Sequence, residues 1–248
     1  MSPSAGFMQG AKLQVQHEGR KVVPMQYKAV IFDLDGTLID SLEDLADSVN
    51  LMLESYSFPT HEVEKYRYFV GNGSRKLIER TLPKEQAASA EFVEEALAKY
   101  KAIYKEHLLR KTHPYQGVQE LLAALKKRRI PLAVCTNKHN DAAQTIVKML
   151  FGQNTFDEVI GGRIGHPEKP DPSVPLEIAA AMGAKPEEVA YLGDTSVDME
   201  TAVRAGFLPI GVLWGFRPEK ELIESGAKVL LKKPSELLEK VDIDACSV

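Results

Sequence analysis

The sequence has few cysteines and no long apolar run, and both absences narrow the class of protein. Only two cysteines occur among the 248 residues, Cys135 within an apolar run and Cys246 near the C-terminus. They form neither a metal-binding spacing nor the framework of a disulfide-rich protein, so the cytoplasm is the expected location. Charges or prolines interrupt every apolar run well before the roughly 20 residues that a membrane-spanning helix needs, so no membrane partner is expected.

Neither sign of charge dominates the sequence. The 31 Lys and Arg residues against 35 Asp and Glu residues give a formal net charge of -4. Because no block of like charge offers the electrostatic footprint of a nucleic-acid binder, we expect no nucleic-acid partner. At this length, and with 44% hydrophobic residues, the chain can form one large domain or a core domain with a smaller insertion.

Short apolar runs, each followed by turn residues, recur along the chain. They are AVIF from Ala29, PLAVC from Pro131, FDEVI from Phe156, VAYLG from Val189 and PIGVLW from Pro209. Helical periodicity fills segments between the later runs, as in GVQELLAALKKRR and DPSVPLEIAAAMG. This alternation predicts an α/β fold, a Rossmann-like doubly wound parallel sheet that helices cover on both faces.

One interval between the first two predicted strands breaks this alternation. Residues from about Asp40 to Thr112 carry helical periodicity almost throughout, and the interval is too long for one crossover helix. We therefore expect an inserted α-helical domain. At its start, Ser41 with Asp44 three residues later is a start signal for the first inserted helix.

The expected organisation has three parts. Residues 1–24 read as a polar N-terminal extension that lacks the continuous apolar centre of a signal peptide. Residues 25–40 and 113–248 form the core domain, and residues 41–112 form the helical insertion.

Polar side chains follow three of the predicted strands, and a lysine lies in a proline-stiffened loop. In an open α/β sheet, residues that follow the strands face one crevice. Taken singly, each has an ordinary explanation as a helix cap, a turn former or a solvated residue. Together they are more telling, because three carboxylates that converge without cations would repel one another and resist ionisation. The set is Asp33 and Asp35, Thr136, Asn137 and Lys138, Gly193 and Asp194, and Lys169 in HPEKPDP.

A hard cation removes this repulsion. Magnesium prefers oxygen ligands and commonly works with one or two carboxylates and a substrate phosphate, although manganese or cobalt can replace it. An ionised carboxylate can attack phosphorus and form an aspartyl phosphate, which splits one difficult hydrolysis into two steps. Lysine, hydroxyl and amide donors then offset charge on the phosphoryl oxygens. The pattern predicts phosphoryl transfer on a small-molecule phosphate ester.

Four segments of the chain resemble, in order, the four motifs of the haloacid dehalogenase-like hydrolase superfamily. They are DLDGTL from Asp33, CTNK from Cys135, PEKPDP from Pro167 and GDTSVDMETA from Gly193. The resemblance covers the core from about Ala29 to Trp214, and the helical insertion resembles the family's cap domain of the first type. It therefore implies the fold predicted above, with an inserted α-helical cap domain.

The resemblance implies roles for the carboxylates. Asp33 is the expected nucleophile and a Mg²⁺ ligand, and Asp194 completes the metal site. Asp35 is expected to offer its backbone carbonyl to the metal and its side chain as general acid and base. Because members that cleave carbon-halogen or phosphonate bonds lack this second aspartate, Asp35 favours a leaving alkoxide that must be protonated, as in phosphomonoester hydrolysis.

The remaining motif residues are expected to hold the phosphoryl group. Thr136 hydrogen-bonds it, Asn137 belongs to the substrate-binding set, and Lys169 pairs with its oxygens and with Asp33. Asp198 is expected to orient either Lys169 or a metal-bound water.

The inserted segment VGNGSRKLIERTL from Val70 resembles the cap segment of phosphoglycolate phosphatases, so 2-phosphoglycolate is the expected substrate. Gly71, Asn72 and Gly73 can bring backbone amides to an anion, and the guanidinium of Arg75 matches a carboxylate or a phosphate. Arg75 can equally form a surface pair with Glu79, four residues later.

Other functions stay open on the sequence alone. A β-phosphoglucomutase-like enzyme typically has a histidine in the first cap helix where this chain has Leu45, and a pyrophosphatase or nucleotidase of the same superfamily would share the motifs. A signalling receiver domain has a different motif order and about half the length. A phosphate-binding regulatory protein on the same fold is the non-enzyme alternative. The oligomeric state is expected to be a monomer or a homodimer.

Overall fold

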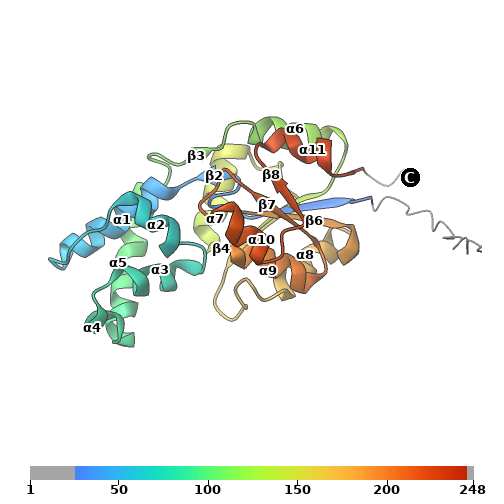
Figure 1. Cartoon of the computed structure of the whole chain (residues 1–248). Helices are drawn as coiled ribbons and strands as arrows, with labels where there is room; N and C mark the ends of the chain where they lie inside the picture. The colour runs from blue at the N-terminus through green and yellow to red at the C-terminus, as the bar shows by residue number, and fades with distance from the viewer. Residues whose placement is uncertain (1–25, 245–248) are drawn as a thin grey trace, which may run out of the picture.

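A six-stranded parallel sheet lies at the centre of the molecule (Figure 1). The computed structural model describes residues 26–244, so the extension expected over residues 1–24 and Cys246 lie outside it. The strands run in the order β5-β4-β1-β6-β7-β8. Their bounds are β1 Ala29–Phe32, β4 Leu132–His139, β5 Glu158–Gly162, β6 Val189–Gly193, β7 Leu208–Val212 and β8 Val229–Leu231. The predicted doubly wound parallel sheet is confirmed, and the sequence analysis missed only β8 of these strands.

Helices cover both faces of the sheet because the side chains of its central strand alternate in direction. Val30 and Phe32 of β1 pack with α6, α7 and α11, whereas Ala29 and Ile31 pack with α8 and α9. Figure 1 shows these helices above and below the strands. The bounds are α6 Val118–Lys127, α7 Asn140–Phe151, α8 Ser173–Ala181, α9 Ser196–Ala205, α10 Glu219–Glu224 and α11 Leu237–Lys240.

The position of β1 between β4 and β6 brings distant segments of sequence together. Phe32 pairs with Val134 on one side and with Leu192 on the other. All three strands are parallel, so the residues that follow them emerge at the same edge of the sheet. The chain also reverses its direction of strand addition around β1, which is where open α/β sheets bind ligands.

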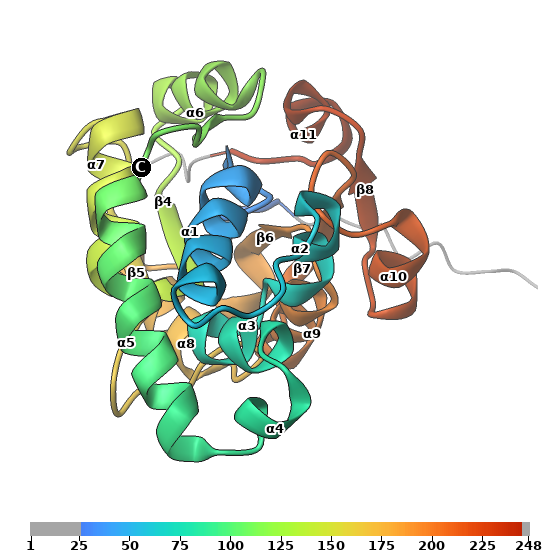
Figure 2. The same cartoon turned by 90° about the vertical axis from the view of Figure 1, so that its left-hand side faces the viewer.

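Five helices are inserted between two short strands at this edge. The helices are α1 Leu42–Ser55, α2 Val63–Phe69, α3 Gly73–Thr81, α4 Lys84–Ala87 and α5 Ala90–His107. The strands β2 (Ile39–Asp40) and β3 (His113–Pro114) pair antiparallel and form a ribbon at the base of the insertion. Figure 2, viewed from this side, shows the inserted helices in front of the sheet.

The inserted helices have an apolar cluster of their own, which includes Val49, Tyr66, Ile78 and Tyr100. Phe216, from the loop after β7, is the core side chain that joins this cluster. The helical cap is therefore a layer with its own buried side chains. That residues 41–112 form a separate domain stays a prediction.

The predicted start of α1 is confirmed, because the helix begins at Leu42 with Ser41 as its N-cap residue. Ser41 makes no side-chain capping bond, and its hydroxyl donates instead to Asp35 Oδ1 at 2.6 Å. Asp44 is buried and accepts hydrogen bonds from the backbone of Lys111 and Thr112 and from the Thr112 hydroxyl at 2.6 Å. Both side chains thus join α1 to distant segments rather than to the first turn of their own helix.

We expect Asp44→Ala to lower the free energy of unfolding by about 3 kcal/mol, because it leaves the backbone N–H of Thr112 and its hydroxyl without an acceptor. Urea unfolding followed by circular dichroism measures this loss. Asp47→Ala is the matched control on α1, because its half-exposed carboxylate binds only the exposed ammonium of Lys111, and it should cost less than about 1 kcal/mol. Equal losses in the two variants would contradict the role of Asp44.

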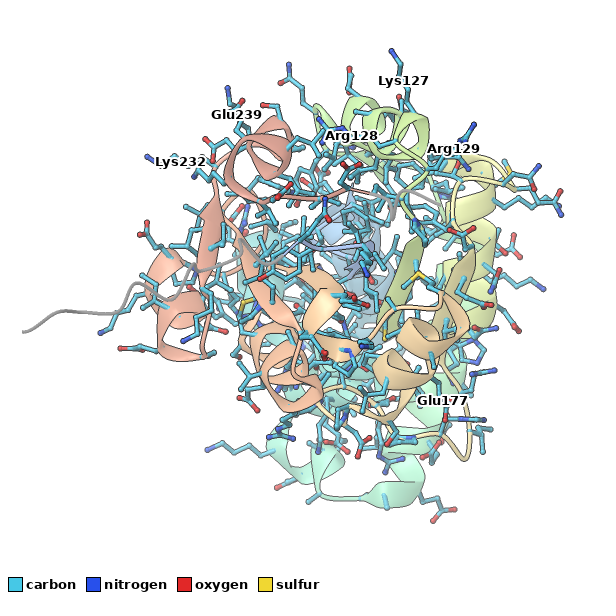
Figure 3. The ribbon with its side chains drawn as sticks, turned by 90° about the vertical axis from the view of Figure 1, so that its right-hand side faces the viewer. Lys127, Arg128, Arg129, Glu177, Lys232 and Glu239 are labelled. Atoms are coloured by element: carbon cyan, nitrogen blue, oxygen red, sulfur yellow. The ribbon has the colours of Figure 1, made fainter. Side chains whose placement is uncertain are left out.

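Figure 3 shows the end of the molecule opposite the cap, where labelled charged side chains such as Lys127, Glu177 and Glu239 point away from the sheet. Across residues 26–244, the structure contains no helix with both the length and the apolar character to cross a membrane.

Candidate active site

Three buried aspartates meet where β1 and β6 end. Asp33 follows β1, Asp194 follows β6, and Asp198 lies in the first turn of α9. One carboxylate oxygen from each lies within 4.8 Å of the others, which is the spacing of a candidate metal site. The convergence of carboxylates that the sequence predicts therefore exists, with Asp198 as its third member in place of Asp35.

The electrostatics of this cluster fit a cation. Burial raises the pKa of Asp33 to about 6, and the charge of Asp198 adds to the rise while Lys169 opposes it. Burial, followed by the charges of Asp198 and Asp33, raises the pKa of Asp194 well above its usual value. The one cation beside Asp33 in the described part of the chain is the Lys169 ammonium, 2.9 Å from Oδ1, and it faces three carboxylates. A hard divalent ion would supply further positive charge, so Asp33 and Asp194 are candidate side chains to bind one.

Glycines make room for the aspartates. A Cβ on Gly36 would lie 2.2 Å from Asp194 Oδ2, and a Cβ on Gly215 would lie 2.3 Å from the Cβ of Asp194. Gly36 also has a φ of 84°, which side chains rarely adopt. The backbone of the first motif and the loop after β7 can therefore approach Asp194 only because both positions lack a side chain.

Lys169 lies between two of the aspartates. Its ammonium is 2.9 Å from Asp33 Oδ1 and 2.6 Å from Asp198 Oδ1. Although burial alone would lower the pKa of Lys169, the charges of Asp198 and Asp33 raise it well above its usual value, so the lysine stays a cation. Asp198 Oδ2 accepts hydrogen bonds from the backbone and hydroxyl of Thr195. The direct contact of Asp198 Oδ1 with the Lys169 ammonium fits a role in orienting Lys169.

Asp35 lies beside this cluster and is held by two donors. The Ser41 hydroxyl donates to Oδ1 at 2.6 Å, and the Lys138 ammonium is 3.0 Å from Oδ1 and 3.1 Å from Oδ2. Lys138 follows the second predicted strand, and no role was predicted for it. Its one signal was its place beside Thr136 and Asn137, and the structure shows it buried against the expected acid and base.

The segment that follows Cys135 in β4 presents polar groups to the same space. The pairing of β4 with β5 shifts register between Cys135 and His139. The Thr136 hydroxyl lines the cavity and accepts a hydrogen bond from the backbone of Lys138. The Asn137 side chain donates to the carbonyl oxygens of Gly71 and Lys169 and accepts from the backbone of Lys169. Asn137 therefore joins the cap to the lysine loop, and protein groups occupy the amide expected to bind substrate.

The glycines expected in the cap segment line the cavity, but two other residues from that prediction do not. Gly71 and Gly73 face the cavity. Asn72 precedes α3, and its Oδ1 accepts a hydrogen bond from Arg80. Arg75 is exposed and pairs with Glu79 and Glu94 on the surface of the cap. The structure thus places Asn72 and Arg75 outside the cavity lining, because neighbouring charged groups on the cap bind both side chains.

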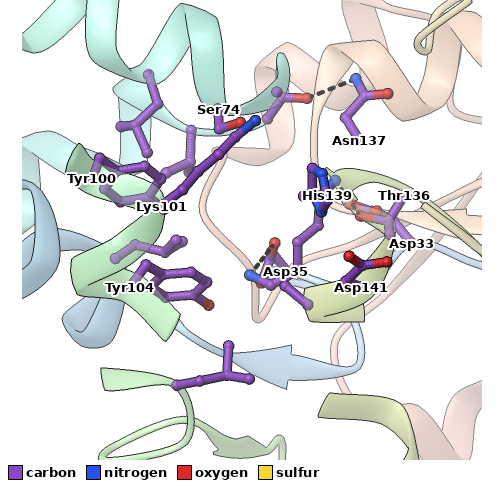
Figure 4. Close-up of a pocket in the computed structure, with 18 of the residues that line it drawn as sticks. Asp33, Asp35, Ser74, Tyr100, Lys101, Tyr104, Thr136, Asn137, His139 and Asp141 are labelled. Carbon is purple, nitrogen blue, oxygen red and sulfur yellow. Dashed lines mark hydrogen bonds and ion pairs between the residues drawn. The ribbon is translucent and has the colours of Figure 1, made fainter. Parts of the chain in front are cut away.

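A cavity of about 470 Å³ lies between the core and the cap. Figure 4 shows Asp33, Asp35 and Thr136 on its core side, and Tyr100, Lys101 and Tyr104 of α5 on its cap side. Leu45 of α1 lines it where the mutase alternative expects a histidine. The cavity therefore combines a charged floor with a largely apolar roof, which is typical of a small-molecule site.

Comparison with known proteins identifies the family. The family model described as haloacid dehalogenase-like hydrolase matches residues 30–212. The phosphoglycolate phosphatase of Chromobacterium violaceum is 33% identical over 212 residues, which cover 85% of this chain and 94% of that protein. The phosphoglycolate phosphatase of Aquifex aeolicus is 31% identical over 215 residues, covering 87% of this chain and 97% of that protein.

Solved structures agree with these sequence relatives. A crystal structure from Lactobacillus delbrueckii subsp. bulgaricus, provisionally named a phosphoglycolate phosphatase, superposes with a TM-score of 0.80 at 30% identity and covers 87% of this chain and 98% of its own. A predicted phosphoglycolate phosphatase from Haemophilus somnus gives a TM-score of 0.79 at 27% identity, covering 86% of this chain and 97% of its own. With the buried aspartates, the lysine between them and a family match that runs from β1 to β7, the chain belongs to the haloacid dehalogenase-like hydrolase family.

Proposed function

We propose that the protein is a magnesium-dependent phosphatase that hydrolyses 2-phosphoglycolate to glycolate and phosphate through an aspartyl phosphate. The observation that carries the reaction type is the placement of two carboxylates with different surroundings at the end of β1. Asp33 lies in the acidic cluster against Lys169, and Asp35 lies outside it against Ser41 and Lys138. The names of the relatives support the choice of 2-phosphoglycolate.

Asp33 is the proposed nucleophile, because its carboxylate lies 2.9 Å from the Lys169 ammonium, whose charge favours the ionised form against the effect of burial. Asp33 and Asp194 would hold Mg²⁺, which supplies positive charge to the phosphoryl oxygens. Lys169 and the Thr136 hydroxyl bind the phosphoryl group from the other side. One oxygen of Asp33 attacks phosphorus, and the bond to the ester oxygen breaks.

Asp35 manages the protons of both steps. In its protonated form it gives a proton to the departing glycolate oxygen, and as a carboxylate it then accepts one from the water that attacks the aspartyl phosphate. The hydrogen bond from Ser41 and the ion pair with Lys138 fix the orientation of this side chain. The cap covers the cavity and limits access of water to the intermediate.

A sugar-phosphate mutase is the second candidate in the same family. The presence of Leu45 in the cavity wall disfavours it, because this side chain cannot transfer a proton to a bound sugar. We place the enzyme in the cytoplasm as a monomer or homodimer.

Phosphate release from a panel of esters tests the proposed function. The panel contains 2-phosphoglycolate, pyrophosphate, hexose phosphates and nucleoside monophosphates, each with magnesium and with a chelator. We expect 2-phosphoglycolate to have the highest kcat/KM and the chelator to abolish release. If another ester has the highest kcat/KM, the substrate assignment is rejected and the mechanism is kept. If the chelator leaves phosphate release unchanged, the dependence on magnesium is rejected.

A further inference from the structure

Lys138 is a buried cation that the phosphoryl-transfer steps do not require. Its side chain is 5% exposed, and its ammonium lies 4.7 Å from the centre of the Tyr104 ring. A lysine ammonium has three N–H donors, and the two Asp35 oxygens accept at most two of them. Since both Lys138 and Asp35 line the cavity, a donor remains available to a bound molecule.

Tyr104 brings a second donor to the same place. The side chain is 6% exposed, and its buried hydroxyl has no hydrogen bond to any residue that the structure describes. Burial, followed by the charges of Asp35 and Asp44, raises the pKa of Tyr104 well above its usual value, so the hydroxyl keeps its proton. Tyr100 stacks on its ring at 5.6 Å. Figure 4 shows Tyr104 at the cavity beside Asp35.

These donors lie close to the position of the leaving group. Asp35 must come within about 3 Å of the ester oxygen to protonate it, and the Lys138 ammonium is 3.0 Å from Asp35. Lys138 therefore lies within about 6 Å of that oxygen, and the carboxyl carbon of glycolate is two bonds from the same oxygen. Resting on the proposed phosphatase function, the geometry points to Lys138 and Tyr104 as the subsite for a leaving-group carboxylate, which selects 2-phosphoglycolate over esters of neutral alcohols.

Other cations near the cavity are less suited to this contact. Arg75 is paired with Glu79 and Glu94 on the outer surface of the cap. Lys101 and Lys105 line the cavity, but both are exposed; Figure 4 shows Lys101 extending across the cavity toward Ser74. A solvated ammonium binds an anion weakly, whereas a buried ammonium and a buried hydroxyl lose little hydration when they bind a carboxylate.

Three esters that differ at one group test the subsite. 2-Phosphoglycolate carries the carboxylate, 2-hydroxyethyl phosphate replaces it with a neutral hydroxymethyl group, and phosphoethanolamine places an ammonium there. We expect Lys138→Met to lower the ratio of kcat/KM for 2-phosphoglycolate to that for 2-hydroxyethyl phosphate by roughly 10- to 100-fold. The relative turnover of phosphoethanolamine should rise. The ratio matters because Lys138 also holds Asp35, so kcat falls for every ester.

Tyr104→Phe is the second variant, and it removes only the hydroxyl. Since that hydroxyl has no partner in the described structure, the melting temperature should not fall. The ratio of the two kcat/KM values should decrease roughly 5- to 10-fold. Lys99→Met is the matched control on α5, because its ammonium lies over the Tyr56 ring at 3.9 Å and outside the cavity lining, and it should leave the ratio unchanged.

The outcomes separate the subsite from the function on which it rests. If Lys138→Met lowers kcat/KM equally for all three esters, Lys138 only positions Asp35 and the subsite is overturned. The subsite is also overturned if the ratio of kcat/KM values shifts in Lys101→Met but not in Lys138→Met. Chelator-sensitive turnover by the wild type without preference for 2-phosphoglycolate would overturn the subsite and leave the phosphatase proposal intact. Release from no ester would overturn the proposed function. Calorimetry then tests the subsite independently of turnover. It compares the affinity of Asp33→Asn for 2-phosphoglycolate with that of the same variant carrying Tyr104→Phe, and an unchanged affinity would overturn the role of Tyr104.

Discussion

Asp33→Asn should reduce phosphate release by at least about four orders of magnitude and abolish the covalent intermediate, because a neutral amide is a poor nucleophile and a weaker metal ligand. The fold should not suffer. Burial and the charge of Asp198 raise the pKa of Asp33 to about 6, so the carboxylate is costly in its ionised form and its replacement removes that cost. Rapid quenching with labelled substrate, followed by mass spectrometry, measures the acyl phosphate, and thermal unfolding measures stability.

Asp171→Asn is the control for this variant. Asp171 belongs to the loop that carries Lys169, but its carboxylate accepts hydrogen bonds from Ser173 outside the main cavity. The kcat of Asp171→Asn should lie within a few-fold of the wild-type value. An Asp33→Asn variant that retains substantial activity, or that still forms a covalent phosphoenzyme, would contradict the assignment of the nucleophile.

Asp35→Asn should lower kcat for 2-phosphoglycolate by about a thousandfold while the protein stays folded. The amide oxygen can still accept from Lys138 and Ser41, which now hold the Asp35 carboxylate. The two steps should respond differently to the leaving group. A p-nitrophenolate departs without protonation, so p-nitrophenyl phosphate should phosphorylate Asp33 rapidly, and the intermediate should then persist because no base activates water.

A stopped-flow burst detects this behaviour. We expect Asp35→Asn to release about one equivalent of p-nitrophenol per site quickly and then to turn over slowly, and Asp33→Asn to show no burst. A variant of Asp35 that loses the burst together with steady turnover would show that Asp35 is needed for attack itself. The role of a proton shuttle would then be rejected.

The fold was predictable because each core strand carries its own local signal. AVIF, PLAVC, FDEVI, VAYLG and PIGVLW are apolar runs flanked by turn residues, and each contains at least half of a strand of the observed sheet. The β8 strand at the sheet edge, Val229–Leu231, was missed because three residues beside lysines give no such signal. The pairing of β2 with β3 was equally hidden, since two-residue strands are defined by their partner and not by their own sequence.

The positions of site residues near strand ends were predictable from the sequence. The contacts of long side chains that have several possible partners were not. Asp33, Lys169 and Asp194 meet because the order of the strands brings their loops together. The sequence left Arg75 open between the site and a surface pair, because a guanidinium suits an acidic neighbour as well as a ligand, and the structure shows the surface pair with Glu79.

The contacts of Ser41 and Lys138 were not predictable either. Ser41 and Asp44 correctly indicated the start of α1, but not that the hydroxyl of Ser41 donates to Asp35. Lys138 was seen only as a charged neighbour of the motif, although its ammonium is buried against the same carboxylate. Lys138 reaches an acceptor 103 residues away in sequence, whereas Ser41 reaches one six residues away, and neither pairing has a recognised sequence pattern.

The ribbon of β2 and β3 has a consequence for how such enzymes diversify. Asp40 pairs with His113, so the whole insertion leaves and re-enters the core at one point, and its length does not affect the register of the sheet. A different cap could be spliced between these two residues while the nucleophile, its metal ligands and Lys169 keep their places. Substrate range can then change by recombination at the ribbon, and the reaction chemistry is inherited unchanged with the core.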